Sequence, residues 1–174
     1  MIKKILHTKL GAMVGFKLGI KGFNRLVAVG DDGKVSRSYN YRVNKGADLV
    51  GSLLTGTSLN SISSPLPPKY LALSTSSLSP AYTDTTLTGE TAATGLTRGL
   101  TTVGAYTSPT LLDGAASYTL SYTFTNSSGG SVSIVSAAIF DAVSSGNLFA
   151  ESNLSATYNL GIGNTLALTW TINI

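Results

Sequence analysis

The 174-residue sequence contains no cysteine and a single histidine, and only 11% of its residues are charged. Without cysteine there is no disulfide framework and no thiolate chemistry, so stability must come from packing, sheet hydrogen bonds or oligomerisation. The one histidine, His7, has no second His or Cys partner. We therefore expect it to be a solvated side chain and expect neither a metal centre nor a histidine base.

Motifs for catalysis are also missing. There is no Gly-x-Ser-x-Gly elbow, and no Gly-Lys-Ser/Thr follows the glycines of the leader to make a phosphate cradle. Carboxylates for a glycosidase pair are formally available, but turn positions and a pairing of Glu90 with Arg98 explain them better. These carboxylates are Asp84, Glu90, Asp113, Asp141 and Glu151. We expect no enzymatic activity, no catalytic residue, no cofactor and no small-molecule substrate.

The shortage of charge favours a protein that assembles with neighbours. Ser, Thr, Gly, Asn and Ala fill positions that Glu and Lys occupy in most soluble proteins, where about 25% of residues are charged. Burying Thr or Asn at an interface costs far less than burying an unpaired charge. The composition therefore predicts subunit contacts, and we expect a homo-oligomer, with a trimer favoured.

The charges that are present divide the chain into two parts. Residues 1–45 contain ten basic and two acidic side chains, a balance of +8, and residues 46–174 contain two basic and six acidic ones, a balance of −4. We interpret residues 1–22 as a basic arm that attaches the protein, although a first strand or a tail remains an alternative. The expected attachment residues are Lys3, Lys4, Lys9, Lys17, Lys21 and Arg25.

The next segment, residues 23–62, reads as a hairpin plus a short helix. Two β-rich runs between Phe23 and Val43 flank Asp32-Gly33, a pair typical of hairpin turns. A short helix is expected at 46–54, and prolines then end the segment. Residues 63–174 form the expected main domain, with residues 23–174 as one domain kept as an alternative. Arg and Tyr side chains alternate at 37–42, a pattern that could bind single-stranded nucleic acid by stacking and phosphate pairing. Such alternation is more typical of a strand with one polar and one aromatic face, so we expect no nucleic-acid partner.

Short strands then follow at regular spacing, which predicts an all-β protein, an antiparallel β-sandwich of jelly-roll-like type with a basic N-terminal arm. The expected strands are 69–74, 96–106, 116–125, 131–141, 147–152 and 164–174. The expected core residues are Tyr70, Phe124, Phe140, Leu168, Trp170 and Ile172. Residues 132–140 are apolar on both faces, so we expect this strand to be covered on each side, with a neighbouring subunit as one candidate cover.

An ordered series of motifs resembles small virion structural proteins of tailed bacteriophages. Tyr70-Leu-Ala-Leu-Ser-Thr is followed by Pro80, Asp84-Thr-Thr-Leu, Glu90 and Arg98, and later by Ala137-Ala-Ile-Phe-Asp, Gly146-Asn-Leu-Phe-Ala and Gly163-Asn-Thr-Leu-Ala-Leu-Thr-Trp-Thr-Ile. The series covers roughly residues 65–174, with a weaker echo over 25–55. Two positions depart from the family pattern: Ser74 replaces the usual Gly, and Asn164 replaces the usual Asp.

This resemblance implies a structural component of the virion, assembled in the host cytoplasm, such as a capsid decoration protein or a neck or tail accessory. Its partners would be other virion proteins. Two alternatives remain: a carbohydrate-binding module for host attachment, because a β-sandwich can present a glycan platform, and a membrane-active cationic protein, which rests on the basic leader alone. The longest stretch of the leader without charge, 10–16, is too short to span a membrane, so a membrane partner is not expected.

Overall fold

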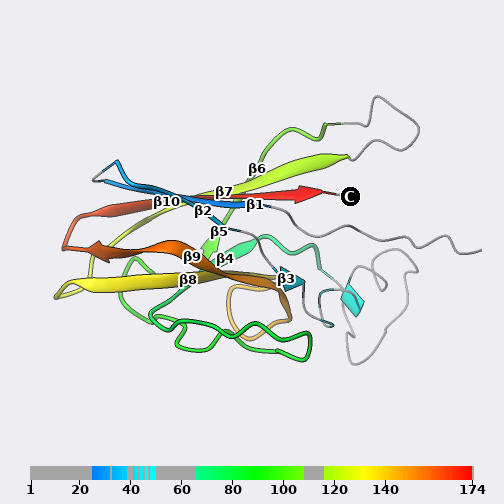
Figure 1. Ribbon diagram of the computed structural model, residues 1–174, viewed down its shortest axis with the longest axis horizontal. Helices are drawn as coiled ribbons and strands as arrows, with labels where there is room; N and C mark the ends of the chain where they lie inside the picture. The colour runs from blue at the N-terminus through cyan, green and yellow to red at the C-terminus, as the bar shows by residue number, and fades with distance from the viewer. Residues whose placement is uncertain are drawn as a thin grey trace, which may run out of the picture.

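The computed structural model describes residues 25–31, 33–38, 41–42, 44, 46, 48–49, 66–107 and 116–173. The expected arm, residues 1–22, lies outside the described residues. In the described part the protein is nearly all β, and two antiparallel five-stranded sheets pack face to face (Figure 1). This confirms the β-sandwich that the strand pattern predicts, while the finer jelly-roll connectivity remains a prediction.

The first sheet, called here the β10 sheet, contains the hairpin, the last strand and two strands from the middle of the chain. Its spatial order is β2 (Val35–Ser38), β1 (Arg25–Gly30), β10 (Thr165–Asn173), β7 (Ser117–Thr125) and β6 (Thr102–Val103). The second, the β8 sheet, has the order β3 (Tyr41–Arg42), β9 (Leu148–Leu160), β8 (Val132–Phe140), β4 (Tyr70–Ser74) and β5 (Gly99–Leu100).

Strands from the early segment take part in both sheets. β1 pairs with β10 from Arg25 opposite Thr171 onward, and β3 pairs with β9. The sheets therefore combine strands from residues 23–62 with strands from residues 63–174. Asn44, Gly46, Asp48 and Leu49 are helical, whereas residues 50–54 of the expected short helix lie outside the described residues.

Two strands differ from the sequence-based expectation. β9 continues to Leu160 instead of ending at 152, because Leu154, Tyr158 and Leu160 keep an apolar side facing the core. The pairing of β9 with β8 is irregular between Ile134 and Ser136, so the alternation of apolar and polar residues does not run unbroken along β9. The sequence pattern alone therefore does not show that the strand continues. The expected strand 96–106 is instead divided into β5 and β6, which belong to opposite sheets.

The core lies between the sheets and is built from the apolar side of each strand. Of the six expected core residues, five are buried: Phe124, Phe140, Leu168, Trp170 and Ile172. Tyr70 is half-buried and packs against a second, smaller cluster on the outer side of the β8 sheet. Trp170 is fully buried in the main cluster, at the centre of β10.

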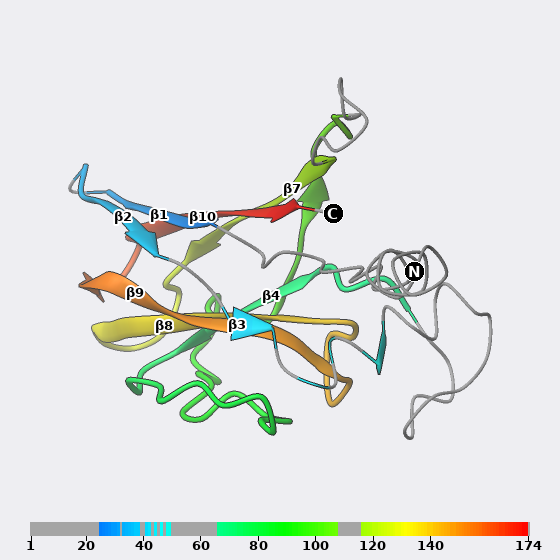
Figure 2. The same cartoon turned by 45° about the vertical axis from the view of Figure 1, so that its right-hand side comes forward.

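The outer side of the β8 sheet is covered by the chain itself. Residues 75–98, called here the covering loop, connect β4 to β5 and lie against this sheet (Figure 2). Leu78 and Leu87 of the loop pack with Ala138 and Phe140 of β8. The doubly apolar strand 132–140 therefore finds its second cover within its own chain, so a neighbouring subunit is not needed to explain its pattern.

Candidate assembly surfaces

The expected attachment residues fall largely outside the described part of the chain. Lys3, Lys4, Lys9, Lys17 and Lys21 lie outside the described residues. Arg25 is the first residue of β1, and its backbone pairs with Thr171 of β10. Arg25 is thus placed on the sandwich itself and not in the segment 1–22.

Polar side chains from the β8 sheet hold the covering loop in place. The Asn153 amide on β9 forms two hydrogen bonds with the backbone of Leu78: its oxygen accepts from the amide N–H at 2.7 Å, and its nitrogen donates to the carbonyl at 2.9 Å. Ser136 Oγ donates to the carbonyl of Ser76 at 2.8 Å. These bonds satisfy backbone groups that burial would otherwise leave unpaired.

Ser74, one of the two departures from the family pattern, belongs to this set of contacts. Its hydroxyl is fully buried, donates to the Thr88 carbonyl at 2.5 Å and accepts from the Ser76 amide at 2.9 Å. Gly89 passes so close that an added Cβ would lie 2.1 Å from Ser76 Oγ. The Ser74 hydroxyl therefore joins the start of the covering loop to its middle part at Thr88, which a glycine could not do.

Arg98 at the end of the covering loop forms the ion pair that the sequence indicated. Its guanidinium donates to both carboxylate oxygens of Glu90, at 2.6 and 2.8 Å, and to the carbonyls of Ala142 and Ser145. It also lies 3.4 Å above the centre of the Phe140 ring. The Arg98 side chain is 10% exposed. This planar, multiply bonded group links the loop to the turn that follows β8.

A pair of carboxyl groups completes the attachment of the loop. Glu151 on β9 is 2% exposed and is hydrogen-bonded to Asp84 of the covering loop. Burial first, and then the hydrogen bond and negative charge of Asp84, raise the pKa of Glu151 to about 8. The arrangement of the two carboxyl groups fits a structural contact.

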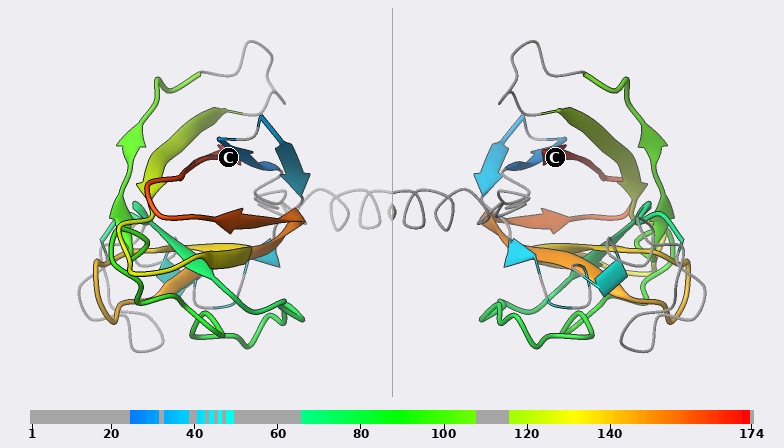
Figure 3. Two further views of the ribbon diagram at one scale, coloured as in Figure 1. Left: turned by 90° about the vertical axis from the view of Figure 1, so that its left-hand side faces the viewer. Right: turned by 90° about the vertical axis from the view of Figure 1, so that its right-hand side faces the viewer.

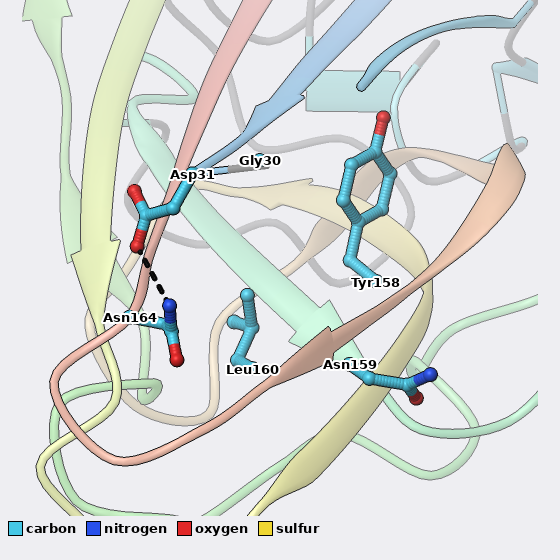
Figure 4. A pocket seen from close by; sticks show the side chains of 6 residues that line it. All are labelled: Gly30, Asp31, Tyr158, Asn159, Leu160 and Asn164. Carbon is cyan, nitrogen blue, oxygen red and sulfur yellow. Dashed lines mark hydrogen bonds between the residues drawn. The ribbon is translucent and has the colours of Figure 1, made fainter. Parts of the chain in front are cut away.

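The second departure from the pattern, Asn164, lies in the turn between β9 and β10. Its amide nitrogen donates to the Asp31 carboxylate at 3.2 Å, as Figure 4 shows, and Thr165 donates to the same carboxylate through its N–H and its hydroxyl. These hydrogen bonds lower the pKa of Asp31, with the Thr165 hydroxyl the largest cause. An aspartate at 164 would repel Asp31. The residues surround a cavity of only about 70 Å³, which is too small for a ligand of ordinary size.

The outer side of the β10 sheet consists largely of hydroxyl side chains. The ten outward positions of β10 and β7 contain no charged residue, and eight are Thr or Ser. We call this surface the threonine face; its positions are Thr165, Ala167, Thr169, Thr171, Asn173, Ser117, Thr119, Ser121, Thr123 and Thr125. No described segment lies over it (Figures 1 and 3).

A second notable surface is an apolar groove at the open edge of the sandwich, beside β6. Its lining includes Pro67, Val103, Tyr106 and Tyr118. Val103 and Tyr106 are 57% and 59% exposed. Burial raises the pKa of Tyr118, which lines the inner wall. The core thus reaches the surface between the two sheets at this edge.

Within the described residues, no group of three His, Cys, Asp or Glu side chains could hold a metal ion. No helix of the described part is long and apolar enough to cross a membrane. Sequence reasoning had not identified the threonine face, although its alternating Thr positions are visible in the last strand.

The fold and its surfaces therefore define a small β-sandwich protein in which the chain's own loop covers one sheet and no described segment covers the other. A family model, Podophage GP4 fiber I protein gp80, matches residues 47–171. The chain belongs to this family of tailed-phage virion structural proteins, and its place is in the assembled virion. A search of curated proteins finds no match.

The match confirms the resemblance to tailed-phage virion proteins and the expectation of a structural role in contact with other virion proteins. It begins at residue 47, so it includes β4 to β10 and the covering loop but neither the hairpin nor residues 1–22.

Proposed function

We propose that the protein is a non-enzymatic subunit of a podophage fibre that assembles with copies of itself and is anchored by its basic N-terminal arm. The observation that supports this most is the family match over residues 47–171, whose name refers to a fibre. That name favours a fibre over the capsid-decoration and neck positions that the motif resemblance also allowed. By analogy with other particle accessories, a trimer is the favoured state.

The arm part of the proposal is tested by truncation. A chain that begins at Gly22 keeps β1, which begins at Arg25, and should therefore fold into the same sandwich. It should no longer associate with particles that lack this protein, whereas the full chain should associate. Circular dichroism measures folding, and co-sedimentation with the particles measures attachment.

A matched variant separates charge from apolar contact. Replacing Lys3, Lys4, Lys9, Lys17 and Lys21 together with Gln leaves the length of the arm unchanged. If basic side chains provide the attachment, this variant should bind weakly and binding of the wild type should fall as salt rises, since exposed charges are screened over about 8 Å at physiological ionic strength. Full attachment by the truncated chain would contradict the anchoring role, and loss of folding would reassign residues 1–22 to the sandwich.

A further inference from the structure

We propose that the threonine face is the surface through which copies of this chain contact one another. This rests on the proposed function, because it specifies which surface makes the assembly. The two outer sides of the sandwich differ: the covering loop closes the β8 sheet, whereas no described segment closes the β10 sheet. The β10 sheet therefore offers a surface that a second copy of the chain can cover.

The absence of charge on this face is what favours a copy of the same chain as the partner. Around a symmetry axis, identical residues of neighbouring copies approach one another, so any charge near the axis meets its own like. The ten positions of β10 and β7 avoid this entirely. β2 and β1 lie on one side of β10 in the sheet, where the rim of such an interface would be.

Hydroxyl groups make the face complementary to itself. Each Ser or Thr hydroxyl can donate one hydrogen bond and accept two, so facing hydroxyls find partners in many relative positions. One such contact exists within the subunit, between Ser121 Oγ of β7 and Thr169 Oγ1 of β10 at 3.1 Å. The methyl groups of Thr and the side chains of Val27, Val29 and Ala167, which share the face, add apolar contact.

The surface that surrounds the face is large enough to form a major part of an interface. A nine-residue strand is about 30 Å long and neighbouring strands lie about 4.8 Å apart, so β10 and β7 with the adjacent parts of β1 and β6 present roughly 500 Å². A stable interface of standard size uses about 800 Å² per partner. The threonine face together with the adjacent parts of β1 and β6 thus supplies more than half of such an interface.

The experiment places one lysine at the centre of the face. In the full chain, Thr169→Lys should raise the protein concentration at which the oligomer is half dissociated by more than about a hundredfold, because like charges then meet at the contact. Thr123→Lys should act in the same direction, and since Thr123 is already exposed on the subunit this variant preserves the fold. Analytical ultracentrifugation measures the mass, and circular dichroism checks folding.

The matched control is Thr157→Lys, the same substitution at an exposed position of β9 in the other sheet. It should leave the oligomer unchanged. If Thr157→Lys and Thr123→Lys dissociate the oligomer equally, or neither does, the threonine face is not the interface. If Val103→Lys alone dissociates it, the apolar groove is the interface instead. A wild type that is monomeric at every concentration would overturn both this assignment and the self-assembly part of the proposed function, whereas intact oligomers of all threonine-face variants would overturn this assignment alone.

Discussion

The carboxyl group of Glu151 on β9 is hydrogen-bonded to the carboxyl group of Asp84 in the covering loop. Two acids can share such a contact only while one of them retains its proton, and burial assigns the proton to Glu151, which is 2% exposed. The loop is therefore held by a contact that depends on pH, together with the Asn153 and Arg98 contacts.

A first prediction follows for the effect of pH on stability. Glu151 has a pKa of about 8 in the folded protein and about 4.5 in the unfolded chain, so between these values the folded state holds a proton that the unfolded state has lost. The free energy of unfolding should therefore fall as pH rises from about 5 to 8. The Glu151→Gln variant lacks this titration. Its free energy of unfolding should therefore rise relative to that of wild type by about 2–4 kcal/mol as pH rises across that window.

Urea unfolding at intervals between pH 5 and pH 9 measures the effect. Thr157→Gln, an exposed substitution on the same strand, is the control and should follow the wild type at each pH. A difference in the free energy of unfolding between Glu151→Gln and wild type that stays constant across this pH range would mean that Glu151 is ionised throughout.

Trp170→Ala should destabilise the fold by about 3–5 kcal/mol, because it removes the largest fully buried side chain and leaves a cavity between the sheets. Thr171→Ala changes the next residue of β10, which faces outward, and should cost less than about 1 kcal/mol. Thermal unfolding compares the two. Equal midpoints for Trp170→Ala and wild type would contradict the burial of Trp170.

Arg98→Ala should cost about 2–4 kcal/mol, since it leaves Glu90 without its partner and removes the bonds to Ala142 and Ser145. Arg98→Lys should lose less stability than Arg98→Ala but should remain less stable than wild type, because an ammonium group cannot make the paired contact with both carboxylate oxygens. Limited proteolysis within residues 75–98 should be faster in Arg98→Ala than in Arg98→Lys. Wild-type cleavage rates in both variants would show that Arg98 does not hold the loop.

Gly95→Ala should be destabilising by about 2 kcal/mol or more. Gly95 has φ of +81°, and an added Cβ would lie 1.9 Å from the Thr125 carbonyl oxygen, a backbone atom that cannot move aside cheaply. Gly129→Ala is the matched control because no atom lies within 4 Å of its added Cβ. Comparable unfolding midpoints for the two variants would show that the backbone at 95 relaxes.

Local patterns in the sequence determined much of this protein. Alternation of apolar and polar residues in segments such as 165–173 forces one face toward the core, and this predicted the strands, the sandwich and the burial of Trp170 without knowledge of their partners. The ordered motifs predicted the virion family, and the spacing of Glu90 and Arg98 suggested their ion pair.

Only the tertiary structure decided which surfaces are covered and which are bare. Three features depend on residues that lie far apart in the chain. They are the approach of the covering loop to β8, the contact of Glu151 with Asp84 and the extension of β9 to Leu160. The same apolar pattern in 132–140 is satisfied by a neighbouring subunit or by a loop of the same chain, because alternation reports that a face is buried and not what buries it. The threonine face emerges only when β10 and β7 lie side by side, since each strand alone contributes just half of its positions.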